Sequence, residues 1–534
     1  MPATPTIKGT FRTDRRARAA YAEGAGVYRI IPRAVCLPAN HDDVVALVRW
    51  AAEHEIPLVP RGAGSAMSGA NVGAGVVVDL TAATGQRLEV DPRARRARMP
   101  AGAPLGELAQ EAARHTLRLP PDPSSQTWAT AGGVIGTNAA GARSVRYGSV
   151  RRWAQSVEMV TSEGKMLRLG RGEPGRWGDL SLASLYSRLR PPAATLARWP
   201  KLRKNSFGYA LDEFAASGDA LDLVIGAEGT LGIVTAVEWR LDVVPRCRAG
   251  VRVLLGDYAE LPALVADLRA LEVSAIELLD RTFLDVVRSA EPNLPLPHTE
   301  AVLLVEIEAE SEAALRRAAD AAVRAARPRA VAVDAALSGA GTEQLWRIRH
   351  AASPILARLP PERRSLQVIE DGCVPVERLG EYVAALRQAA ADCDIPVVLF
   401  GHAGDGNVHA NALADTTRRG WQKRLRELYA RATDAVIALG GVPSGEHGAG
   451  RLRAGLLQRA YGEEIVSLFH EVKRSFDPLG IFNPGVILPS GEPPLSRLKV
   501  GAAAARLPPD VERALREIER TGGYATLRLT LADG

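Results

Sequence analysis

The chain has 534 residues, of which 46% are hydrophobic and 24% charged, and its formal net charge is +6. This length exceeds what one hydrophobic core supports, so we expect two globular domains with extensions. Basic residues are scattered among acidic ones, and only 5% of the residues are aromatic. That pattern disfavours nucleic-acid binding, which needs a basic stripe and aromatic side chains for base stacking.

The cysteines are widely spaced. Cys36, Cys247, Cys373 and Cys393 form no CxxC pair, which excludes an iron-sulfur cluster or a zinc ribbon built from this chain alone and favours a reducing compartment. The N-terminus is polar and basic, and no run of 18 apolar residues occurs. We therefore expect no transmembrane segment and a cytoplasmic protein that contacts a membrane at most peripherally.

Composition and pattern divide the chain into four segments. Residues 1–30 are mixed and charged and predict an N-terminal arm, and residues 491–534 predict a C-terminal extension. Between them, residues 31–245 predict strands joined by runs of small residues. Residues 246–490 predict strands alternating with helices, which is an α+β pattern of ferredoxin-like type.

Early in the second segment, helical spacing of apolar residues predicts a helix over residues 42–52 that is capped by Asn40 or Asp42. Short strands are expected over residues 56–59 and 75–80.

Three runs of small residues separate the strands of residues 31–245. They cover residues 60–70, 130–141 and 225–235, and the last leads into an alternating strand over 234–241. The first run does not match a dinucleotide-binding fingerprint, because its glycine spacing differs and it returns to a strand instead of a helix. A nest of backbone N–H groups could hold a phosphate there. Three such loops predict an extended cofactor lying across this domain.

The ferredoxin-like segment ends at a turn that carries histidines. The expected strands are 251–255, 275–279, 302–307 and 365–374, and the expected helices are 258–270, 311–326, 376–391 and 451–475. We expect the histidine turn at the edge of this sheet. In the extension we expect a helix from Pro509 to about Arg520 and a strand from Tyr524 to Leu529.

Two short runs near the end of this segment point to metal chemistry. An apolar strand runs into His402, and Asp405-Gly406 is a hairpin turn sequence that brings His409 back beside it. Glu446 arrives from a separate glycine-rich loop, with His447 next to it as a possible proton acceptor. His402, His409 and Glu446 can thus converge as three ligands, which leaves a position open for substrate.

Together these segments resemble the FAD-linked oxidases of the vanillyl-alcohol oxidase or p-cresol methylhydroxylase (PCMH) fold, in the branch of D-lactate, glycolate and D-2-hydroxyglutarate dehydrogenases. The resemblance covers residues 30–490 and rests on motifs in the family's order, which are the 60–70 loop, the 121–148 region, the 225–235 run, the histidine pair with Glu446-His447, and Asn483-Pro484. It implies an α+β architecture in which a PCMH-type FAD-binding domain precedes a ferredoxin-like α+β cap domain.

The resemblance also implies the cofactors and their residues. We expect non-covalent FAD, since the 60–70 loop has no histidine or cysteine for covalent attachment, and a divalent metal, zinc or manganese. The residues implied to bind FAD are Arg61, Gly62, Gly64, Ser65, Ser68, Gly69, Pro121, Asp122, Gly132, Gly133, Asn138, Gly141, Gly232, Ile233, Val234 and Asn483. The implied metal ligands are His402, His409 and Glu446.

The implied reaction oxidises a D-2-hydroxy acid to the 2-oxo acid by hydride transfer to flavin N5. His447 is the implied base, Asn411 the contact to substrate or metal, and Arg349 the clamp for the substrate carboxylate. The D-2-hydroxyglutarate relatives place a lysine just before Asp371, where this chain has Glu370, so a cation for a second carboxylate is missing unless Arg363 or Arg364 replaces it.

Two alternatives share this scaffold. One is an FAD-dependent transferase of the alkylglycerone-phosphate synthase type, and the other is a flavin subunit that is active only within an iron-sulfur complex. The larger relatives carry a C-terminal iron-sulfur module that is absent here, so the expected electron acceptor is a quinone, a cytochrome or an iron-sulfur protein. The sequence leaves open whether the protein forms a homodimer.

Overall fold

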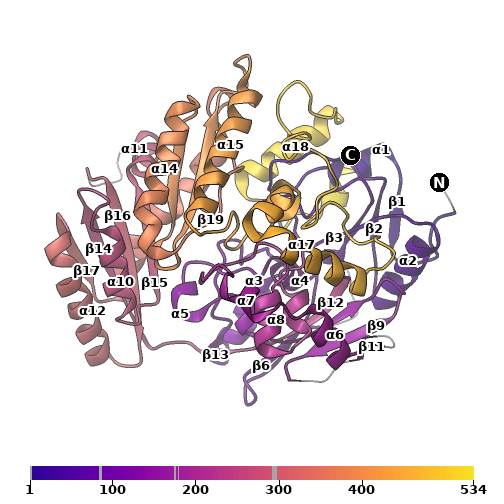
Figure 1. The fold of residues 1–534 in the computed structure, drawn as a ribbon, viewed down its shortest axis with the longest axis horizontal. Coiled ribbons are helices and arrows are strands. Elements are labelled where there is room, and N and C mark those ends of the chain that lie inside the picture. The colour runs from indigo at the N-terminus through magenta and orange to yellow at the C-terminus, as the bar shows by residue number, and fades with distance from the viewer. Residues whose placement is uncertain (1–2, 83–86, 173–175, 178–179, 292–297, 534) are drawn as a thin grey trace.

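The computed structural model describes residues 3–82, 87–172, 176–177, 180–291 and 298–533. Figure 1 shows two halves side by side, with the N-terminal half in indigo to magenta and a second half in pink to orange. The yellow C-terminal segment lies against the N-terminal half, near helix α1 (Arg15–Ala20). No helix of the described residues is long and apolar enough to cross a membrane.

Two sheets form the N-terminal half. The first has the order β1-β2-β4-β3, in which β2, β4 and β3 are parallel, and the second is antiparallel with the order β5-β6-β12-β8-β9. The strands are β1 (Thr10–Arg12), β2 (Ala34–Leu37), β3 (Leu58–Arg61), β4 (Val76–Asp79), β5 (Glu89–Asp91), β6 (Arg96–Pro100), β8 (Ala154–Val160), β9 (Met166–Gly170) and β12 (Ile233–Arg240). The predicted strands near 56–59, 75–80 and 234–241 are therefore present.

The small-residue runs differ from one another in secondary structure. The 60–70 run leaves β3 and reaches β4 without a helix, as predicted. The 130–141 run was expected to be a loop, but its centre is helix α4 (Ala131–Thr137). Thr130 caps this helix by accepting the N–H of Gly133, and Val134 and Ile135 are buried in the core. These interactions outweigh the low helix propensity of its glycines.

The second half is built on an eight-stranded sheet in which β17-β14-β16-β15 come first, β20-β21-β18 follow, and β19 pairs with β21 outside this order. The first four strands, with α10 and α12 as connections, have the ferredoxin-like order that was predicted. The elements are β14 (Cys247–Leu255), α10 (Leu261–Arg269), β15 (Ala275–Asp280), α11 (Arg281–Ala290), β16 (Ala301–Ala309), α12 (Glu312–Ala326), β17 (Ala332–Ala336), α13 (Gly339–Ala357), β18 (Arg364–Leu366), β19 (Gly372–Cys373), α14 (Leu379–Asp392), β20 (Val397–His402) and β21 (Asn407–Ala414).

The histidine hairpin does not lie at the edge of this sheet, contrary to the prediction. β20 pairs with β15, and β21 pairs with β18 and β19. The reason is that β20 is apolar on both faces, so it is stable only between neighbouring strands and covering helices. The predicted strand 365–374 is also interrupted, because β18 and β19 are separate and Glu370 and Asp371 lie between them.

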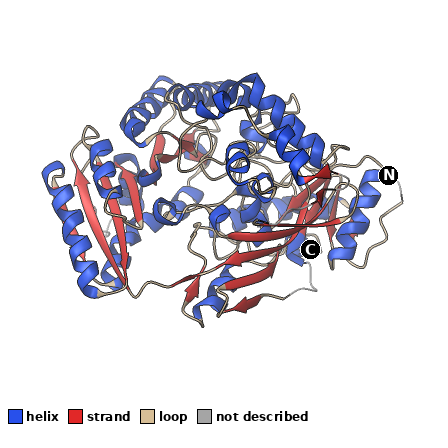
Figure 2. Ribbon diagram, turned by 60° about the horizontal axis from the view of Figure 1, so that its bottom comes forward, coloured by secondary structure: helices blue, strands red, loops and turns tan. Residues whose placement is uncertain are grey.

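Helices cover both faces of the sheet, as Figure 2 shows. Successive side chains of a strand point to opposite faces. In β16, Leu303 and Val305 belong to the core shared with α10, α12, α14 and α15, whereas Val302 and Leu304 pack with α11 and α13. The alternation carries on along the strand, so Glu306 lies on the α11 and α13 side.

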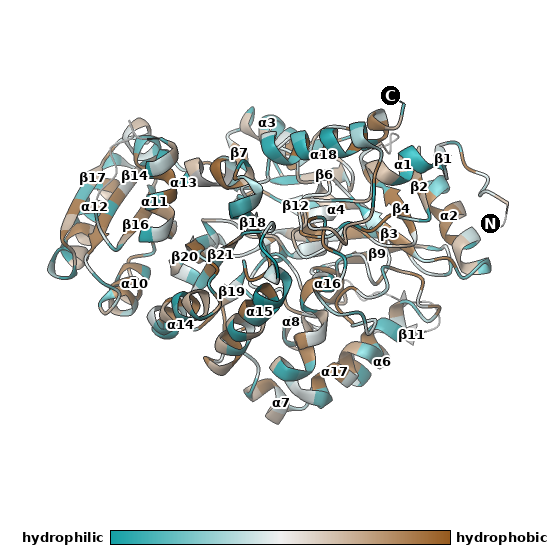
Figure 3. Ribbon diagram, turned by 90° about the horizontal axis from the view of Figure 1, so that it is seen from above, coloured by the Kyte–Doolittle hydropathy of each residue, from teal (hydrophilic) through white to brown (hydrophobic). Residues whose placement is uncertain are grey.

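The chain ends with further helices that pack on both halves. They are α15 (Trp421–Ala438), α16 (Gly450–Arg453), α17 (Leu457–Phe476) and α18 (Pro509–Thr521). The predicted helix 451–475 is thus divided between α16 and α17 by a short 3-10 turn. In Figure 3, α15 carries both teal and brown, as expected of a helix with one buried face. The predicted strand from Tyr524 to Leu529 is wrong: Arg528–Leu531 is a 3-10 turn, and the Tyr524 ring lies against Trp128 instead.

Shorter elements complete the fold. They are α2 (His41–Glu53), which is capped by Asn40 as predicted, η1 (Leu80–Ala82), α3 (Leu105–Ala113), β7 (Leu117–Arg118), α5 (Ser144–Tyr147), η2 (Val150–Arg152), β10 (Arg176–Trp177), β11 (Leu180–Ser181), α6 (Leu182–Leu189), α7 (Ala193–Ala197), α8 (Leu211–Ser217), α9 (Leu221–Val224), β13 (Asp242–Val243), η3 (Arg327–Arg329), η4 (Pro361–Arg363), η5 (Val376–Arg378), η6 (Ala403–Asp405) and η7 (Ala454–Leu456).

Candidate active site

A cavity of about 910 Å³ lies where the two halves meet, and both halves contribute to its wall. This volume is at the upper end of the range for small-molecule sites. Predicted residues that line it are Arg61, Gly62, Gly64, Ser65, Asp122, Gly132, Gly133, Gly141, Gly232, Val234, Arg349, His402, His409, Asn411, Glu446 and His447. The three small-residue runs and the histidine hairpin therefore face one shared cavity.

Some predicted residues lie behind the wall. Asn483 is fully buried and donates its amide N–H groups to the carbonyls of Ala70 and Glu228, so it joins two of the glycine-rich segments. Ser68 donates its hydroxyl to the carbonyl of His447. These residues position the wall instead of forming it, and Gly69, Pro121, Asn138 and Ile233 also lie outside the lining set.

Glycine is required where the loops of the N-terminal half approach one another. A Cβ at Gly62 would lie 2.0 Å from the Thr130 hydroxyl oxygen. Gly64 has a φ of +78°, and a Cβ there would lie 2.4 Å from the Arg61 guanidinium. That guanidinium donates to the carbonyls of Tyr21, Glu23 and Asn71. Arg61 therefore holds its own loop through main-chain contacts.

Strand alternation in the second half gathers polar side chains on one face. His402 follows Val398 and Phe400 on β20, and His409 precedes Asn411 on β21, so all of them lie on the α11 and α13 side of the sheet. Phe400 is paired directly with His409, which places the two histidines diagonally across the hairpin. The predicted approach of the two imidazoles is present.

Three donor atoms converge at this hairpin. His402 Nε2 lies 3.0 Å from Glu446 Oε1 and 3.2 Å from His409 Nε2, and His409 Nε2 lies 3.3 Å from Glu446 Oε1. Ligands at about 2.0–2.1 Å from a tetrahedral cation are about 3.3 Å apart, so this triangle has the size of one face of a coordination shell. Within the described residues, His402, His409 and Glu446 form a group able to hold a metal ion.

Hydrogen bonds set the tautomers of these ligands. His409 Nδ1 lies 2.7 Å from the carbonyl of Glu370, so it must carry a proton and leave Nε2 with a lone pair. His402 Nδ1 lies 2.5 Å from the carboxylate of Glu277. Burial lowers the pKa of His402, but Glu277 outweighs it and raises that pKa to about 9. A proton on His402 Nε2 forms a hydrogen bond with Glu446 Oε1 alone. A divalent cation would instead be coordinated by all three donor atoms, His402 Nε2, His409 Nε2 and Glu446 Oε1.

The second oxygen of Glu446 is held from the N-terminal half. Lys204 Nζ and the N–H of Gly141 each donate to Oε2 at 2.9 Å, and Lys204 is almost fully buried. Burial opposes ionisation of Glu446, but Lys204 and His402 together hold its pKa well below the usual value. Only Oε1 is thereby directed at the histidines.

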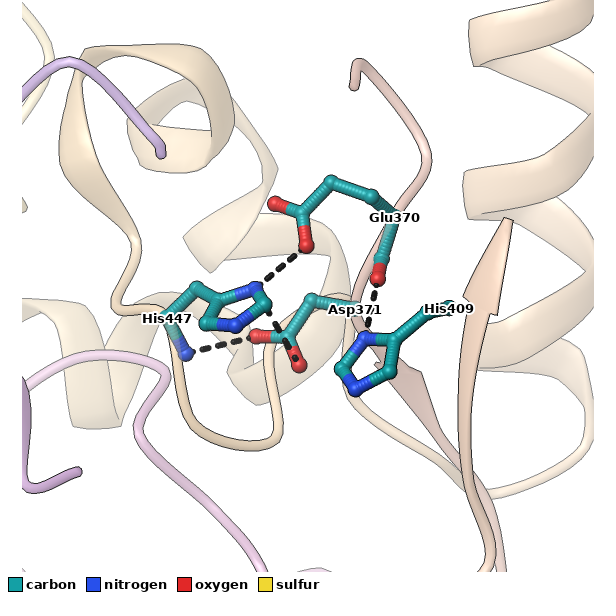
Figure 4. A group of neighbouring side chains, drawn as sticks. All are labelled: Glu370, Asp371, His409 and His447. Carbon is teal, nitrogen blue, oxygen red and sulfur yellow. Dashed lines mark hydrogen bonds and ion pairs between the residues drawn. The ribbon is translucent and has the colours of Figure 1, made fainter. Parts of the chain in front are cut away.

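His447 is fixed by two acidic residues, as Figure 4 shows. Its Nδ1 is hydrogen-bonded to the carboxylate of Glu370, and its backbone N–H donates to Asp371 at 2.8 Å. Asp371 also accepts from the N–H of Glu446 and the hydroxyl of Ser444, so it anchors this loop. Because Nδ1 donates to Glu370, Nε2 is the nitrogen that carries the lone pair when the ring is neutral, and it lies 3.8 Å from Glu446 Oε1.

The charge on Glu370 acts on His447. Burial lowers the pKa of His447, but Glu370 and Asp371 raise it to about 10. Glu370 itself is fully buried; burial raises its pKa, whereas His447 and Arg453 outweigh that effect and bring it to about 2. A divalent cation bound to Glu446 would lower the pKa of His447 again, because like charges repel.

Arg349 and Asn411 lie beside this centre. Arg349, on α13, donates from Nε to Glu277 at 2.8 Å and lies over the Phe400 ring at 4.8 Å. It is therefore not a solvated surface arginine. Burial opposes ionisation of Glu277, but His402 and Arg349 hold its pKa at about 2. Asn411 Oδ1 accepts the hydroxyl of Ser365 at 3.4 Å.

Four polar residues of this site were absent from the sequence-based set. Glu277 pairs with His402 across β15 and β20, and its place in an alternating strand is the kind of pattern that could have identified it. Glu370, Asp371 and Lys204 come from loops, where no periodicity reports which way a side chain points. Their partners Ser444, His447 and Glu446 lie 73–242 residues away in the chain.

Comparison with known proteins identifies the family of this chain. Residues 32–170 match the FAD binding domain family, and residues 245–487 match the C-terminal domain of FAD linked oxidases. The chain is 30% identical to the glycolate oxidase subunit GlcD of Bacillus subtilis over 86% of this chain and 89% of that protein, and 30% identical to a D-lactate dehydrogenase of Archaeoglobus fulgidus over 86% and 93%. It is 29% identical to a D-2-hydroxyglutarate dehydrogenase of Xanthomonas citri over 87% and 90%.

Solved structures agree on the fold. A 4-ethylphenol oxidase from Gulosibacter chungangensis superposes with a TM-score of 0.64 at 16% identity, covering 90% of this chain and 94% of that one. An alkyldihydroxyacetonephosphate synthase superposes with a TM-score of 0.59 at 17% identity, covering 89% and 83%. The predicted pair of an FAD-binding domain and a ferredoxin-like cap is confirmed. The chain belongs to the FAD-linked oxidases, in the branch that contains the hydroxy-acid dehydrogenases.

Proposed function

We propose that this protein is an FAD-dependent dehydrogenase that oxidises a D-2-hydroxy acid to the 2-oxo acid with the help of a divalent metal. The observation that carries the proposal is the convergence of His402, His409 and Glu446 on one point of the cavity wall, with His447 Nε2 beside it. Relatives whose names state glycolate, D-lactate or D-2-hydroxyglutarate as substrate support the substrate class.

FAD fits the part of the cavity lined by the small-residue runs, because backbone N–H groups and the absence of Cβ atoms allow close approach of a pyrophosphate. We assign its binding to the predicted set that includes Gly62, Gly64, Gly133 and Gly232, with Asn483 as a support from behind. The flavin supplies the acceptor for the hydride that leaves the substrate. We infer that attachment is non-covalent.

A zinc or manganese ion fits the three converging donor atoms, and it would supply a Lewis acid that polarises the substrate hydroxyl and carboxylate. Lys204 and Gly141 hold Glu446 so that one oxygen faces the histidines. Glu277 keeps the proton of His402 on Nδ1. Both contacts prepare the ligand atoms before any ion binds.

The proton and the carboxylate of the substrate each have a candidate partner. His447 Nε2 accepts the hydroxyl proton, while Glu370 accepts the Nδ1 proton and stabilises the imidazolium that forms. Among the described contacts of Arg349, only Nε has a hydrogen-bond partner, so its terminal nitrogens remain for the substrate carboxylate. Asn411 lies on the same strand face as His409 and contributes an amide.

The test is anaerobic reduction of the flavin. The purified holoprotein is mixed with D- and L-lactate, glycolate and D-2-hydroxyglutarate, and its visible absorption is followed. We expect bleaching by at least one acid with a preference for the D enantiomer. Absence of bleaching by every acid of the panel, in a protein that carries flavin and metal, would reject the proposal.

An electron acceptor outside this chain is the second part of the proposal. One relative is named as a subunit of glycolate oxidase, so onward electron transfer in this chain is assigned to a separate quinone, cytochrome or iron-sulfur protein. Turnover with an artificial dye separates the possibilities: an isolated chain that bleaches its flavin and reduces the dye is a competent dehydrogenase by itself.

A further inference from the structure

The C-terminal extension forms part of the cavity wall. Glu519 and Thr521 at the end of α18, and Tyr524 just after it, are lining residues. They lie outside the ranges 32–170 and 245–487 that match the two family domains. This wall is therefore an addition to the matched domains, and it borders the same cavity as the histidine centre.

Helix α18 is anchored on the N-terminal half. Val511 and Leu515 are buried in a cluster that includes Tyr21. Glu512 is paired with Arg29 at 2.5 Å, and Asp510 with Arg16 at 2.5 Å. The apolar face and these ion pairs fix the orientation of the helix, so that Glu519 is directed across to the cap domain.

The carboxylate of Glu519 is surrounded by cations. Arg364 of β18 lies 2.7 Å from Oε2, Arg516 lies 2.6 Å from the same oxygen, and Lys499 lies 3.0 Å from Oε1. Lys499 is buried, and Arg516 is also bound by Glu23. Only Arg364 and Glu519 of this group line the cavity. Glu519 is thus held from behind while it occupies the one guanidinium that β18 presents to the cavity.

Two other arginines of the lining also have internal partners. Arg143 is paired with Glu306 at 2.6 Å and Arg248 with Glu343 at 2.9 Å. Arg349 keeps its terminal nitrogens for one substrate carboxylate. An acid with a second carboxylate would meet an Arg364 that is already paired with Glu519.

We propose that Glu519 is a specificity-determining residue that makes the cavity select hydroxy acids with a single carboxylate over those with two. The inference rests on the proposed function, and it names the substrate class of the same site. Occupation of Arg364 by Glu519 removes the group that would bind a second carboxylate bidentately. The C-terminal extension thereby acts as a selective wall.

The test compares the wild type with Glu519→Gln, which keeps the side-chain volume and removes the charge. The readouts are flavin bleaching by D-lactate and by D-2-hydroxyglutarate, and the change in flavin absorption on titration with pyruvate or 2-oxoglutarate, which needs no turnover. In Glu519→Gln we expect the preference for the ligand with two carboxylates over the ligand with one to rise about tenfold or more compared with the wild type. This holds for the ratio of the two kcat/KM values and for the ratio of the two Kd values.

Matched variants separate specificity from folding. Glu512→Gln removes a carboxylate from the same helix on the side facing Arg29, so its ligand preference should equal that of the wild type. Arg364→Gln combined with Glu519→Gln should cancel the gain. An unchanged preference in a folded, flavin-loaded Glu519→Gln protein overturns the inference. The titrations give this answer even if no acid bleaches the flavin, an outcome that rejects the proposed function separately.

Discussion

The N-terminal half presents backbone to the cavity, whereas the second half presents charged side chains on a sheet. Gly62 and Gly64 are present because no Cβ fits, and Arg61 binds main-chain carbonyls. On the sheet, Glu277 holds His402, and it also accepts from Arg349 of α13. We infer from this contrast that the two halves have different roles. The N-terminal half binds a large cofactor by shape and backbone N–H groups, and the second half aligns the groups that react.

The largest expected effect comes from the reacting side chain of the second half. His447→Ala removes the proposed proton acceptor but leaves the small-residue runs intact. We expect kcat to fall about 10²- to 10⁴-fold while the flavin absorption bands persist. His470→Ala, an exposed histidine of α17, is the matched control and should keep wild-type rates. Loss of flavin in the His447 variant would contradict the division between the halves.

A smaller effect is expected from substitution of Glu277, the buried carboxylate that contacts both the proposed metal ligand His402 and the proposed substrate clamp Arg349. Glu277→Gln keeps the size but removes the charge facing His402 and Arg349. Substitution of such supporting groups costs about 10- to 100-fold in metal affinity or activity. Metal content after dialysis and kcat/KM measure the two consequences, and a variant with wild-type values of both would exclude this role for Glu277.

A substitution in the N-terminal half should weaken FAD binding without lowering the rate of the chemical step. Gly62→Ala places a Cβ 2.0 Å from the Thr130 hydroxyl oxygen, so the loop must shift. An overlap of this kind costs about 1–3 kcal/mol, which corresponds to about 5- to 150-fold in affinity, and we expect it as weaker FAD binding in titrations of the apoprotein. Gly455→Ala is the control, because no atom lies within 4 Å of its added Cβ. If instead kcat fell in the FAD-saturated variant, the two halves would not be separable.

The smallest effect on turnover is expected at the contact between the halves. Glu308 on β16 accepts from Arg118 and Tyr147. Burial raises the pKa of Glu308, but Arg118 outweighs it and brings that pKa to about 2. A carboxyl with a lowered pKa stabilises the fold above its unfolded value near 4.5 and loses this effect as the pH falls towards 2.

The corresponding stability difference is about 3 kcal/mol at neutral pH. Chemical unfolding of Glu308→Gln at pH 7 and at pH 3 measures it, with the exposed Glu517→Gln as control. We expect the gap to the wild type to narrow at the lower pH. A gap that widens there would reverse the sign of the argument.

The sequence predicts the sheet of the second half better than the loops of the first. Strand alternation and the Asp405-Gly406 turn are local, so the hairpin and the face of His402 and His409 follow from them. The position of that hairpin inside the sheet depends on pairing with β15 and β18, which no local pattern reports. Helix α4 was missed because a cap and burial overcame its glycines.

The contacts that complete the site are the least predictable. Lys204 meets Glu446 from 242 residues away, and Glu519 meets Arg364 from 155 residues away. Each partner lies on a different element, and the ion pair exists only because the halves and the extension pack together. A pairing of this kind has no period and no fixed spacing in the chain.

The central claim is that a cation held by His402, His409 and Glu446 is needed for a hydroxy acid to reduce the flavin. The direct measurement treats the holoprotein with a chelator, removes it by dialysis, and follows anaerobic bleaching by the best D-hydroxy acid of the panel. We predict that the flavin remains bound, that bleaching is lost, and that added zinc or manganese restores it. Bleaching at an unchanged rate in metal-free protein would contradict the claim.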